Sequence, residues 1–410
     1  MSSPQPWVGP LSHRVQQLAP SATLHVSQRA AALRAQGHTV VDLGAGEPGL
    51  PTPACIVQAA RDALNRDDIG RYTPVAGIPS LREAACVKFA RDQKLTYDSQ
   101  HILVTPGAKA ALALALEALV NPGDEVILFA PYWTSYSALI RLAGGTPVIV
   151  PTRAQEDYLP RMEAVRQALS PKTKAILLNS PSNPAGAVWP QERLQELVQL
   201  SARQAVWLIS DEIYGRIVFD AAEHTSPASL SRDAWERTIV IDGVSKTHAM
   251  TGWRIGLAAG PANVITAMTK LQSQRFTCAT AVAQHAAAFA LREPPPVADA
   301  IKKMTHAYQQ RRDAVTRWAA TLPRVTCHKP QGAFYLLLDC SAYIGRSIGG
   351  IPIDNDITLA NALLEQARVA AVPGTVFGQP GTLRLSFAAP DHELQQGMER
   401  IEEWLRRKTL

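Results

Sequence analysis

The segment Ser245–Gly256 holds the residues of this sequence best placed to do covalent chemistry. Lys246 follows the apolar run Thr238–Ile241, which predicts a strand, and Arg254 comes eight residues later between two glycines. A lysine amine forms a Schiff base with an aldehyde, and a nearby fixed cation binds phosphate and favours the neutral, nucleophilic amine. The segment therefore predicts a site for an aldehyde that carries a phosphate, whereas a Ser-Lys pair alone is more often a solvated loop.

Predicted strands and helices alternate along the first three quarters of the chain. This alternation favours an α/β fold with a mostly parallel, open sheet covered by helices on both faces, and ligands of such sheets bind at the carboxyl ends of the strands. The predicted strands are Thr39–Leu43, Ile102–Thr105, Val126–Phe129, Pro147–Val150, Ala175–Leu178, a strand within Val206–Tyr214, and Thr238–Ile241. The predicted helices are Ser21–Gly37, Pro53–Arg66, a long helix from Lys109, and Arg161–Leu169.

Three consecutive prolines in Arg292–Pro296 predict a linker, followed by a long amphipathic helix through Arg317. Later strands at Gly332–Leu338, Ala370–Gly374 and Thr382–Phe387 predict a smaller α+β domain. We therefore divide the chain into an N-terminal arm and helix (1–45) that contribute to the small domain, a large domain (46–292) and a small C-terminal domain (293–410).

Two glycine-containing turns follow predicted strands. Gly44–Gly49 matches the GxGxxG dinucleotide fingerprint, but the prolines within and after it prevent the helix that the fingerprint must open. We expect instead a turn that brings the Gly46 backbone close to a ligand. The turn at Gly107 and Ala108 leads into the helix that starts near Lys109, and free N–H groups at a helix start bind anions. This second turn is the predicted cradle for a phosphate.

Polar and aromatic residues follow the other strand ends. Trp133 comes after Val126–Phe129 and offers a flat face for a ring to stack on. Asn183 follows Ala175–Leu178, and Asp211 ends an apolar strand three residues before Tyr214. Each of these residues taken singly has an ordinary structural explanation, as a core aromatic, a turn residue or a helix cap.

Together these motifs resemble the class I and II aminotransferases, the pyridoxal-phosphate enzymes of fold type I. The resemblance rests on the Ser245–Gly256 segment, on Tyr72–Arg82, on Asn183-Pro184-Ala185-Gly186 and on the strand that carries Arg384. It extends from the Leu11–Thr23 segment to Phe387 and is strongest to the bacterial aspartate/prephenate aminotransferases.

The resemblance implies roles for particular residues. Lys246 would form the Schiff base with the cofactor and move the substrate's α-proton, Asp211 would face the pyridine nitrogen, and Tyr214 and Asn183 would hold the ring oxygen. The phosphate would bind Gly107, Ala108, Lys109, Ser245, Arg254 and the neighbouring subunit's counterpart of Tyr72. The substrate would contact Gly46, Trp133, Asn183 and Arg384, with Lys109 and Thr23 near a distal carboxylate.

The implied function is amino-group transfer from an L-amino acid, aspartate being the best candidate, to 2-oxoglutarate by a ping-pong mechanism in a homodimer. The alternatives are an aromatic amino acid or prephenate aminotransferase, or a lyase or oxidase of the same fold. Several residues depart from the family pattern and bear on specificity: Gly49, Ala185, His248, Arg275-Phe276 and Ala19, the last where prephenate-using relatives have lysine.

Composition excludes other classes of function. A net charge of +6 without a basic stripe argues against a nucleic-acid partner, and the apolar run Ala110–Val120 is too short and too interrupted to span a membrane. Five scattered cysteines without a CxxC pair favour reduced thiols over disulfides or a zinc site. The N-terminus lacks a signal-peptide pattern, so we expect a cytoplasmic protein with small-molecule partners and no bound metal.

Overall fold

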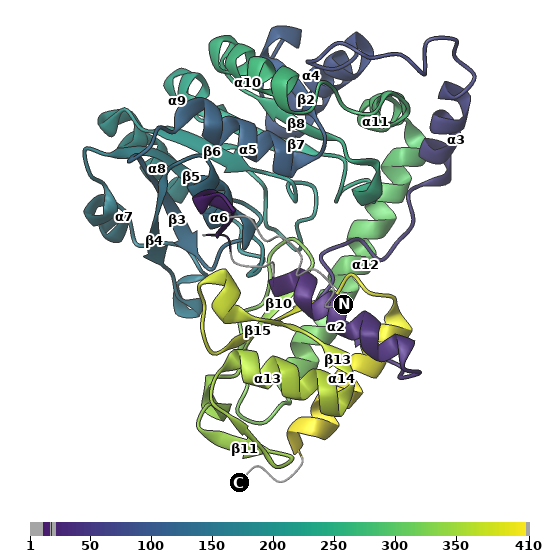
Figure 1. The fold of residues 1–410 in the computed structure, drawn as a ribbon, viewed down its shortest axis with the longest axis vertical. Helices are drawn as coiled ribbons and strands as arrows, with labels where there is room; N and C mark the ends of the chain where they lie inside the picture. Colours follow the sequence, from purple (N-terminus) through teal and green to yellow (C-terminus); the bar gives the residue numbers. More distant parts are fainter. Residues whose placement is uncertain (1–10, 17, 19–21, 407–410) are drawn as a thin grey trace, which may run out of the picture.

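The computed structural model describes residues 11–16, 18 and 22–406, and a seven-stranded sheet forms the centre of its larger part (Figure 1). The strand order is β2-β8-β7-β6-β5-β3-β4; β8 is antiparallel to both neighbours, whereas all other neighbouring strands are parallel. The predicted α/β fold with a mostly parallel sheet is confirmed. The strands are β2 (Ile102–Thr105), β3 (Glu125–Ala130), β4 (Thr146–Pro151), β5 (Thr173–Asn179), β6 (Trp207–Asp211), β7 (Thr238–Gly243) and β8 (Gly256–Ala259).

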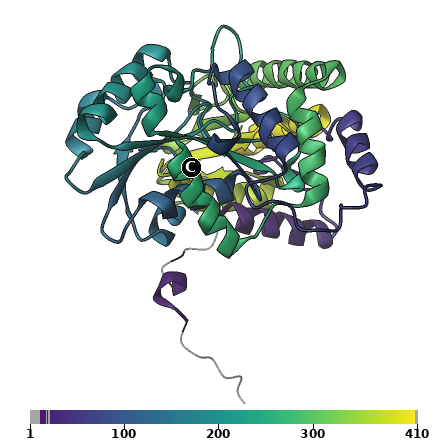
Figure 2. The same ribbon diagram turned by 90° about the horizontal axis from the view of Figure 1, so that it is seen from above.

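Helices cover both faces of this sheet (Figure 2). Successive side chains of a strand point to opposite faces, so in β3 Val126 and Leu128 pack with α5 while Ile127 packs with α8. Apolar residues on both faces explain why the central strands are continuously hydrophobic. The helices around the sheet are α3 (Ala54–Ala63), α4 (Pro79–Gln93), α5 (Ala108–Leu119), α6 (Ser135–Leu142), α7 (Met162–Ala168), α8 (Gln191–Gln204), α9 (Arg232–Arg237), α10 (Ala262–Arg275) and α11 (Ala281–Arg292).

A second, four-stranded antiparallel sheet has the order β14-β15-β10-β9 and forms the lower part of Figure 1. Its apolar face packs against α12, which runs down from the upper part, and against α13 and α14. Strand β1 pairs with β13 beside it, so the chain near residue 41 joins this lower part. The elements are α1 (His13–Gln16), α2 (Ala22–Ala35), β1 (Val41–Asp42), α12 (Pro295–Ala319), β9 (Thr326–Cys327), β10 (Tyr335–Asp339), β11 (Arg346–Ile348), β12 (Ile351–Ile353), α13 (Asp356–Ala362), β13 (Val369–Ala370), β14 (Val372–Pro373), β15 (Thr382–Ser386) and α14 (Asp391–Arg406).

Two local predictions were wrong in detail. The prolines taken as a linker begin α12, because Pro295 and Pro296 occupy its first turn, where a missing N–H costs no hydrogen bond. The strand expected over Ala370–Gly374 is split into β13 and β14. The glycine-rich Gly44–Gly49 opens no helix, as predicted, and α3 starts only at Ala54.

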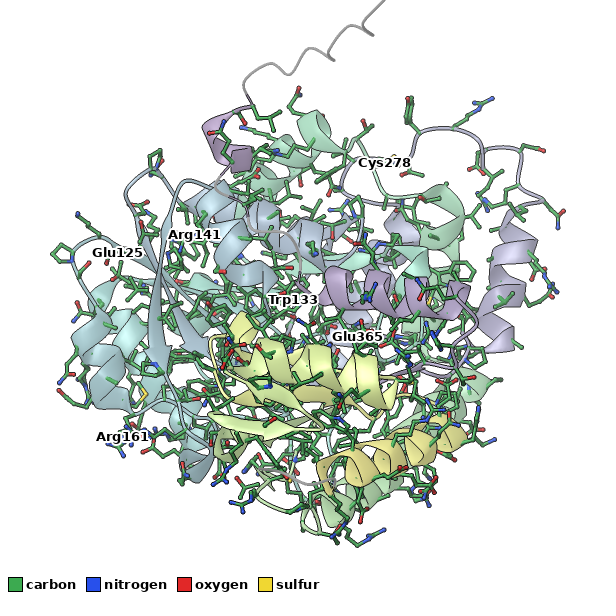
Figure 3. All side chains as sticks on the ribbon, turned by 60° about the horizontal axis from the view of Figure 1, so that its bottom comes forward. Glu125, Trp133, Arg141, Arg161, Cys278 and Glu365 are labelled. Atoms are coloured by element: carbon green, nitrogen blue, oxygen red, sulfur yellow. The ribbon has the colours of Figure 1, made fainter. Side chains whose placement is uncertain are left out.

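The carboxyl ends of the parallel strands meet the antiparallel sheet at the middle of the molecule. Figure 3 labels Glu125, the first residue of β3, toward the edge, and Trp133, which follows the other end of β3, near the centre. Asp211 ends β6, and Lys246 follows β7 on the neighbouring strand. Parallel strands therefore deliver the predicted site residues to one edge of the sheet.

A buried ion pair supports the strand that leads to Lys246. Lys88 of α4 pairs with Asp242 of β7, and both side chains are almost fully buried. Gln93 hydrogen-bonds to both partners: Lys88 Nζ donates to Gln93 Oε1 at 3.0 Å, and Gln93 Nε2 donates to Asp242 Oδ2 at 2.9 Å. Burial raises the pKa of the Asp242 carboxyl, and the Lys88 cation opposes that rise. The pair fixes the end of β7 to α4 four residues before Lys246.

We expect Lys88→Ala to destabilise the protein by about 3–5 kcal/mol, because it leaves the Asp242 carboxylate buried without its cation. The matched control is Lys270→Ala, which removes an exposed helical lysine. Urea or thermal unfolding of both variants checks the prediction. Equal stabilities for the two would show that the pair does not support β7.

Candidate active site

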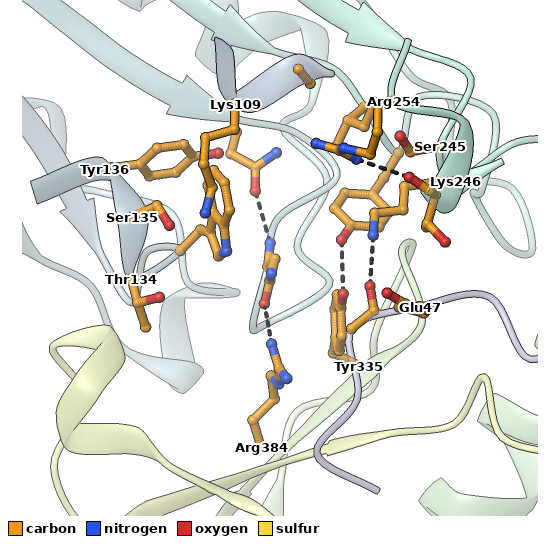
Figure 4. Close-up of a pocket in the computed structure, with 18 of the residues that line it drawn as sticks. Glu47, Lys109, Thr134, Ser135, Tyr136, Ser245, Lys246, Arg254, Tyr335 and Arg384 are labelled. Carbon is orange, nitrogen blue, oxygen red and sulfur yellow. Dashed lines mark hydrogen bonds between the residues drawn. The ribbon is translucent and has the colours of Figure 1, made fainter. Parts of the chain in front are cut away.

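The predicted site residues gather around one cavity of about 570 Å³ between the two sheets (Figure 4). Its walls come from strand ends of the large sheet, from the start of α5 and from two strands of the small sheet, β10 and β15. The predicted residues that line it are Gly46, Ala108, Lys109, Trp133, Asn183, Tyr214, Ser245, Lys246, Arg254 and Arg384.

Lys246 is half-buried and projects into this cavity. Lys246 Nζ donates a hydrogen bond to the carbonyl oxygen of Gly46 at 2.6 Å and lies 5.9 Å from the centre of the Tyr214 ring. Burial lowers the pKa of Lys246 from 10.5 to about 8, against the opposing effect of the Glu47 carboxylate. A substantial fraction of this amine is therefore neutral, and nucleophilic, near neutral pH.

Asp211 is buried beside the cavity and keeps a hydrogen-bonded carboxylate. Tyr136, which lines the cavity, donates to Asp211 Oδ2 at 2.6 Å, and the backbone N–H of Ile213 donates to Oδ1 at 3.2 Å. Burial raises the pKa of Asp211 to about 6, and the hydrogen bond from Tyr136 limits the rise. An ionised carboxylate that water hardly reaches is suited to hold a protonated ring nitrogen.

The turn before α5 is shaped as a cradle for an anion. Gly107 has φ +91°, and a Cβ there would lie 2.3 Å from Arg254 Nη2. A Cβ on Gly256 would lie 2.3 Å from the backbone nitrogen of Ala108. The two glycines thus let the Arg254 guanidinium and the N-terminus of α5 approach each other, and both favour a phosphate group. Ser245 lines the same side of the cavity.

Arg384 enters the cavity from the opposite side, on β15 of the small sheet (Figure 4). Its side chain is buried; Nη1 donates to Asn183 Oδ1 at 3.1 Å and Nη2 to the Gly44 carbonyl oxygen at 2.5 Å. Arg384 Nε is buried without a hydrogen-bond partner among the described residues. Nη1 and Nη2 each keep a second N–H, so this buried guanidinium has donors left for the predicted grip on a carboxylate.

Lys109 and Trp133 form a third wall. Lys109 Nζ lies 5.0 Å from the centre of the Trp133 ring, a cation–π distance. Burial lowers the pKa of Lys109, and the Arg254 charge adds to this effect. Lys109 and Trp133, which were predicted separately as site residues, therefore lie side by side at the cavity.

The predictions for Tyr72 and Thr23 stay predictions. Tyr72 is 88% exposed, away from the cavity of its own chain. Thr23 falls within α2, and its side chain, like Ala19, lies outside the described residues.

The departures from the family pattern have local explanations in packing. A Cβ at Gly49 would lie 1.9 Å from the Ala388 carbonyl oxygen, so the backbone here leaves no room for a side chain. Ala185 packs in a small apolar cluster with Tyr158 and Leu337. Arg275 forms an ion pair with Glu117 at 2.7 Å, so in this chain its charge is already engaged.

His248 departs from the pattern inside the core. It is buried, and neither ring nitrogen has a hydrogen-bond partner in the described part of the chain. Burial, reinforced by Lys88 and Arg216, lowers the pKa of His248 to about 3, so its ring is neutral at physiological pH. It packs as an uncharged ring two residues from Lys246.

Sequence reasoning missed two tyrosines, Tyr136 and Tyr335, that the structure brings to the site. Tyr136 was detectable in principle, because it lies one helical turn after Trp133 and thus on the same face of the chain. Tyr335 lines the cavity from β10 and hydrogen-bonds to the Tyr214 hydroxyl at 2.8 Å. Its contact joins two segments 121 residues apart, and no local pattern predicts it.

The donor set fits pyridoxal phosphate. Lys246 supplies the amine for its aldehyde, the glycine-lined cradle beside Arg254 supplies the phosphate donors, and Asp211 supplies an anion for its ring nitrogen. The residues that meet these three requirements lie around or beside one cavity, and each carries the charge that its part of the cofactor needs.

We expect the reaction of Lys246 with an aldehyde to follow its lowered pKa. In the cofactor-free protein, an aldehyde should form a Schiff base with Lys246, and borohydride traps this product. The rate of trapped Lys246 modification should rise about fivefold from pH 7 to pH 8 and level off above about pH 9. Mass spectrometry of the modified peptides measures this rate, with the exposed Lys302 as internal reference. A Lys246 rate that still climbs at pH 10 would contradict the effect of burial.

Comparison with known proteins agrees with this geometry. The family model described as aminotransferase class I and II matches residues 38–401. The aspartate aminotransferase of Geobacillus stearothermophilus is 42% identical over 96% of this chain and 98% of its own length. The aspartate/prephenate aminotransferase of Cereibacter sphaeroides is also 42% identical, over 96% and 98% respectively.

The structural comparison gives the same result. The structure of Thermus thermophilus aspartate aminotransferase with maleate superposes with a TM-score of 0.90 at 41% identity, covering 97% of this chain and 100% of that one. No described helix is long and apolar enough to cross a membrane. Because the family model and these relatives match most of its length, and because its site has the residues described above, the chain belongs to the class I and II aminotransferases, which depend on pyridoxal phosphate.

Proposed function

We propose that this protein transfers the amino group of L-aspartate to 2-oxoglutarate by a ping-pong mechanism. The observation that carries the proposal is the placement of cations around Lys246: Arg384 on one side of the cavity and Lys109 on another. A dicarboxylic substrate needs two such cations. The names of the relatives from Geobacillus and Thermus, and the dicarboxylate maleate in the latter's structure, support the choice of aspartate.

Each residue has a defined part in this proposal. Arg384 binds the α-carboxylate, and its Asn183 and Gly44 contacts fix the guanidinium plane. Lys246 Nζ would move the proton between the substrate's α-carbon and the aldehyde carbon of the cofactor. Pyridoxal phosphate, when bound, supplies the electron-withdrawing ring that makes this proton acidic. Asp211 holds the ring nitrogen, Tyr214 and Asn183 the ring oxygen, and Gly107, Ala108, Ser245 and Arg254 the phosphate.

Assembly and location are proposals as well. We propose a homodimer in which Tyr72 reaches the cofactor phosphate of the partner subunit; the 88% exposure of this aromatic side chain supports it.

The division into an arm and helix (1–45), a large domain (46–292) and a small domain (293–410) is supported by the separate sheets, and by the pairing of β1 with β13. A cytoplasmic location rests on the sequence alone.

A second candidate is an aminotransferase that also accepts prephenate. The name of the Cereibacter sphaeroides relative favours it. Prephenate carries two carboxylates, so Arg384 and Lys109 suit it as they suit aspartate. Only an assay with prephenate as the amino acceptor separates the two specificities.

Steady-state assays with aspartate and 2-oxoglutarate should show turnover that requires both substrates, with a parallel-line pattern typical of a ping-pong mechanism. Lys246→Ala should lose both this activity and the visible absorbance of the lysine-bound cofactor, because it has no amine for the aldehyde. Release of ammonia or pyruvate without need for a keto acid would identify a lyase or oxidase instead. Glutamate with prephenate as acceptor tests the second candidate.

Lys109→Ala should raise KM for aspartate about tenfold while changing KM for phenylalanine less than about twofold, since only aspartate has a side-chain carboxylate. Initial rates at several substrate concentrations measure both constants. Lys270→Ala, at an exposed lysine outside the cavity, is the matched control. Equal changes for the two substrates would remove Lys109 as the second carboxylate site.

A further inference from the structure

Tyr335 contacts two groups on which the proposed function depends (Figure 4). It is the first residue of β10, and its side chain is only 1% exposed. The chain enters this strand through a constrained turn: Ala333 has φ 58°, and a Cβ on Gly332 would lie 2.7 Å from the Ile217 carbonyl oxygen. The backbone therefore fixes where the Tyr335 ring stands.

The hydroxyl of Tyr335 touches the group that is to hold the cofactor's ring oxygen. Tyr335 and Tyr214 have their hydroxyl oxygens 2.8 Å apart, and the rings meet edge to face. Each hydroxyl has a single hydrogen to donate. When Tyr214 gives its hydrogen to an acceptor in the cavity, the hydrogen between the two oxygens must come from Tyr335. That donation polarises the Tyr214 hydroxyl and makes it a stronger donor.

The ring face of Tyr335 touches the group that is to hold the substrate carboxylate. The Arg384 guanidinium carbon lies 4.5 Å from the centre of the Tyr335 ring and 5.0 Å from that of Phe377. The guanidinium therefore lies close to both aromatic rings while its edge hydrogen-bonds to Asn183 and Gly44. Stacking on an aromatic face limits the orientations open to a buried guanidinium.

We propose that Tyr335 is a positioning residue with two separable actions: its hydroxyl strengthens Tyr214 as a hydrogen-bond donor, and its ring face orients Arg384. The inference rests on the proposed function, because it assigns Tyr214 to the cofactor and Arg384 to the substrate. It predicts that the two actions respond to different substitutions at one position.

Tyr335→Phe keeps the ring face and removes the hydroxyl. A weaker Tyr214 hydrogen bond stabilises the anionic ring oxygen less, which makes the neighbouring protonated nitrogen harder to deprotonate. The pH midpoint of the visible absorbance of the lysine-bound cofactor should therefore rise, by about 0.5 unit. KM for aspartate should stay within about twofold, because Arg384 keeps its support.

Tyr335→Leu removes the hydroxyl and the ring face together. We expect the same rise of the spectroscopic midpoint and, in addition, a rise in KM for aspartate of about tenfold. Tyr343→Phe is the matched control: Tyr343 is equally buried and its hydroxyl donates to the Pro323 carbonyl oxygen at 2.6 Å, outside the cavity. The Tyr343→Phe variant should have the same pH midpoint of visible absorbance and the same KM for aspartate as the wild type.

The double variant Tyr214→Phe/Tyr335→Phe tests whether the hydroxyl acts through Tyr214. Tyr214→Phe alone should raise the midpoint by more than Tyr335→Phe does, and adding Tyr335→Phe should then change nothing further. Additive shifts, or an unchanged midpoint in Tyr335→Phe, would overturn the first action. An unchanged KM for aspartate in a folded Tyr335→Leu variant would overturn the second action, the orientation of Arg384. If that variant does not fold, the KM of Tyr335→Met is judged by the same criterion.

Failure of this inference is distinguishable from failure of the proposed function. A wild-type protein that gains no visible band on addition of pyridoxal phosphate contradicts the proposed function itself. A wild-type protein that binds the cofactor and transaminates, with midpoints insensitive to Tyr335→Phe, contradicts only the role of Tyr335.

Discussion

The burial of the Lys246 amine is the constraint on which the rest of the site depends. Removing an ammonium group from much of its water is unfavourable, and this lowers the pKa of Lys246 to about 8. The neighbouring Arg254 and Arg384 cations act in the same direction, while Glu47 opposes them. The amine is thereby made reactive without being left unpaired, because the Gly46 carbonyl oxygen accepts its hydrogen bond.

The two sheets supply opposite sides of this environment. The parallel sheet brings Asp211 and Lys246 to adjacent strand ends, and the start of α5 adds the glycine turn that we propose as the phosphate site. The small antiparallel sheet contributes Arg384 and Tyr335 from paired strands. Under the proposed function, the large part of the molecule supplies the cofactor residues and Lys109, the small sheet supplies Arg384, and Tyr335 contacts Tyr214 on one side and Arg384 on the other.

Charged groups buried beneath the site maintain its geometry. Lys88 and Asp242 fix the end of β7, and the hydrogen bond from Tyr136 keeps Asp211 ionisable near neutral pH. His248 is packed nearby as a neutral ring, so this departure from the family pattern adds no charge near Lys246 at physiological pH. The departures at Gly49 and Ala185 are likewise accommodated by packing, at positions outside the cavity wall.

The sequence by itself determined the α/β alternation and most of the cavity residues, because strand hydrophobicity, glycine turns and the lysine segment are local signals. Asp211 ends a predicted strand, Gly107 and Lys246 come shortly after predicted strands, and the family resemblance gave these residues their expected roles. Only the tertiary structure decided which faces meet. The contacts of Tyr335 with Tyr214 and Arg384, and of Lys88 with Asp242, join segments far apart in the chain. Such contacts, and the pKa shifts that follow from burial, depend on packing that no short stretch of sequence encodes.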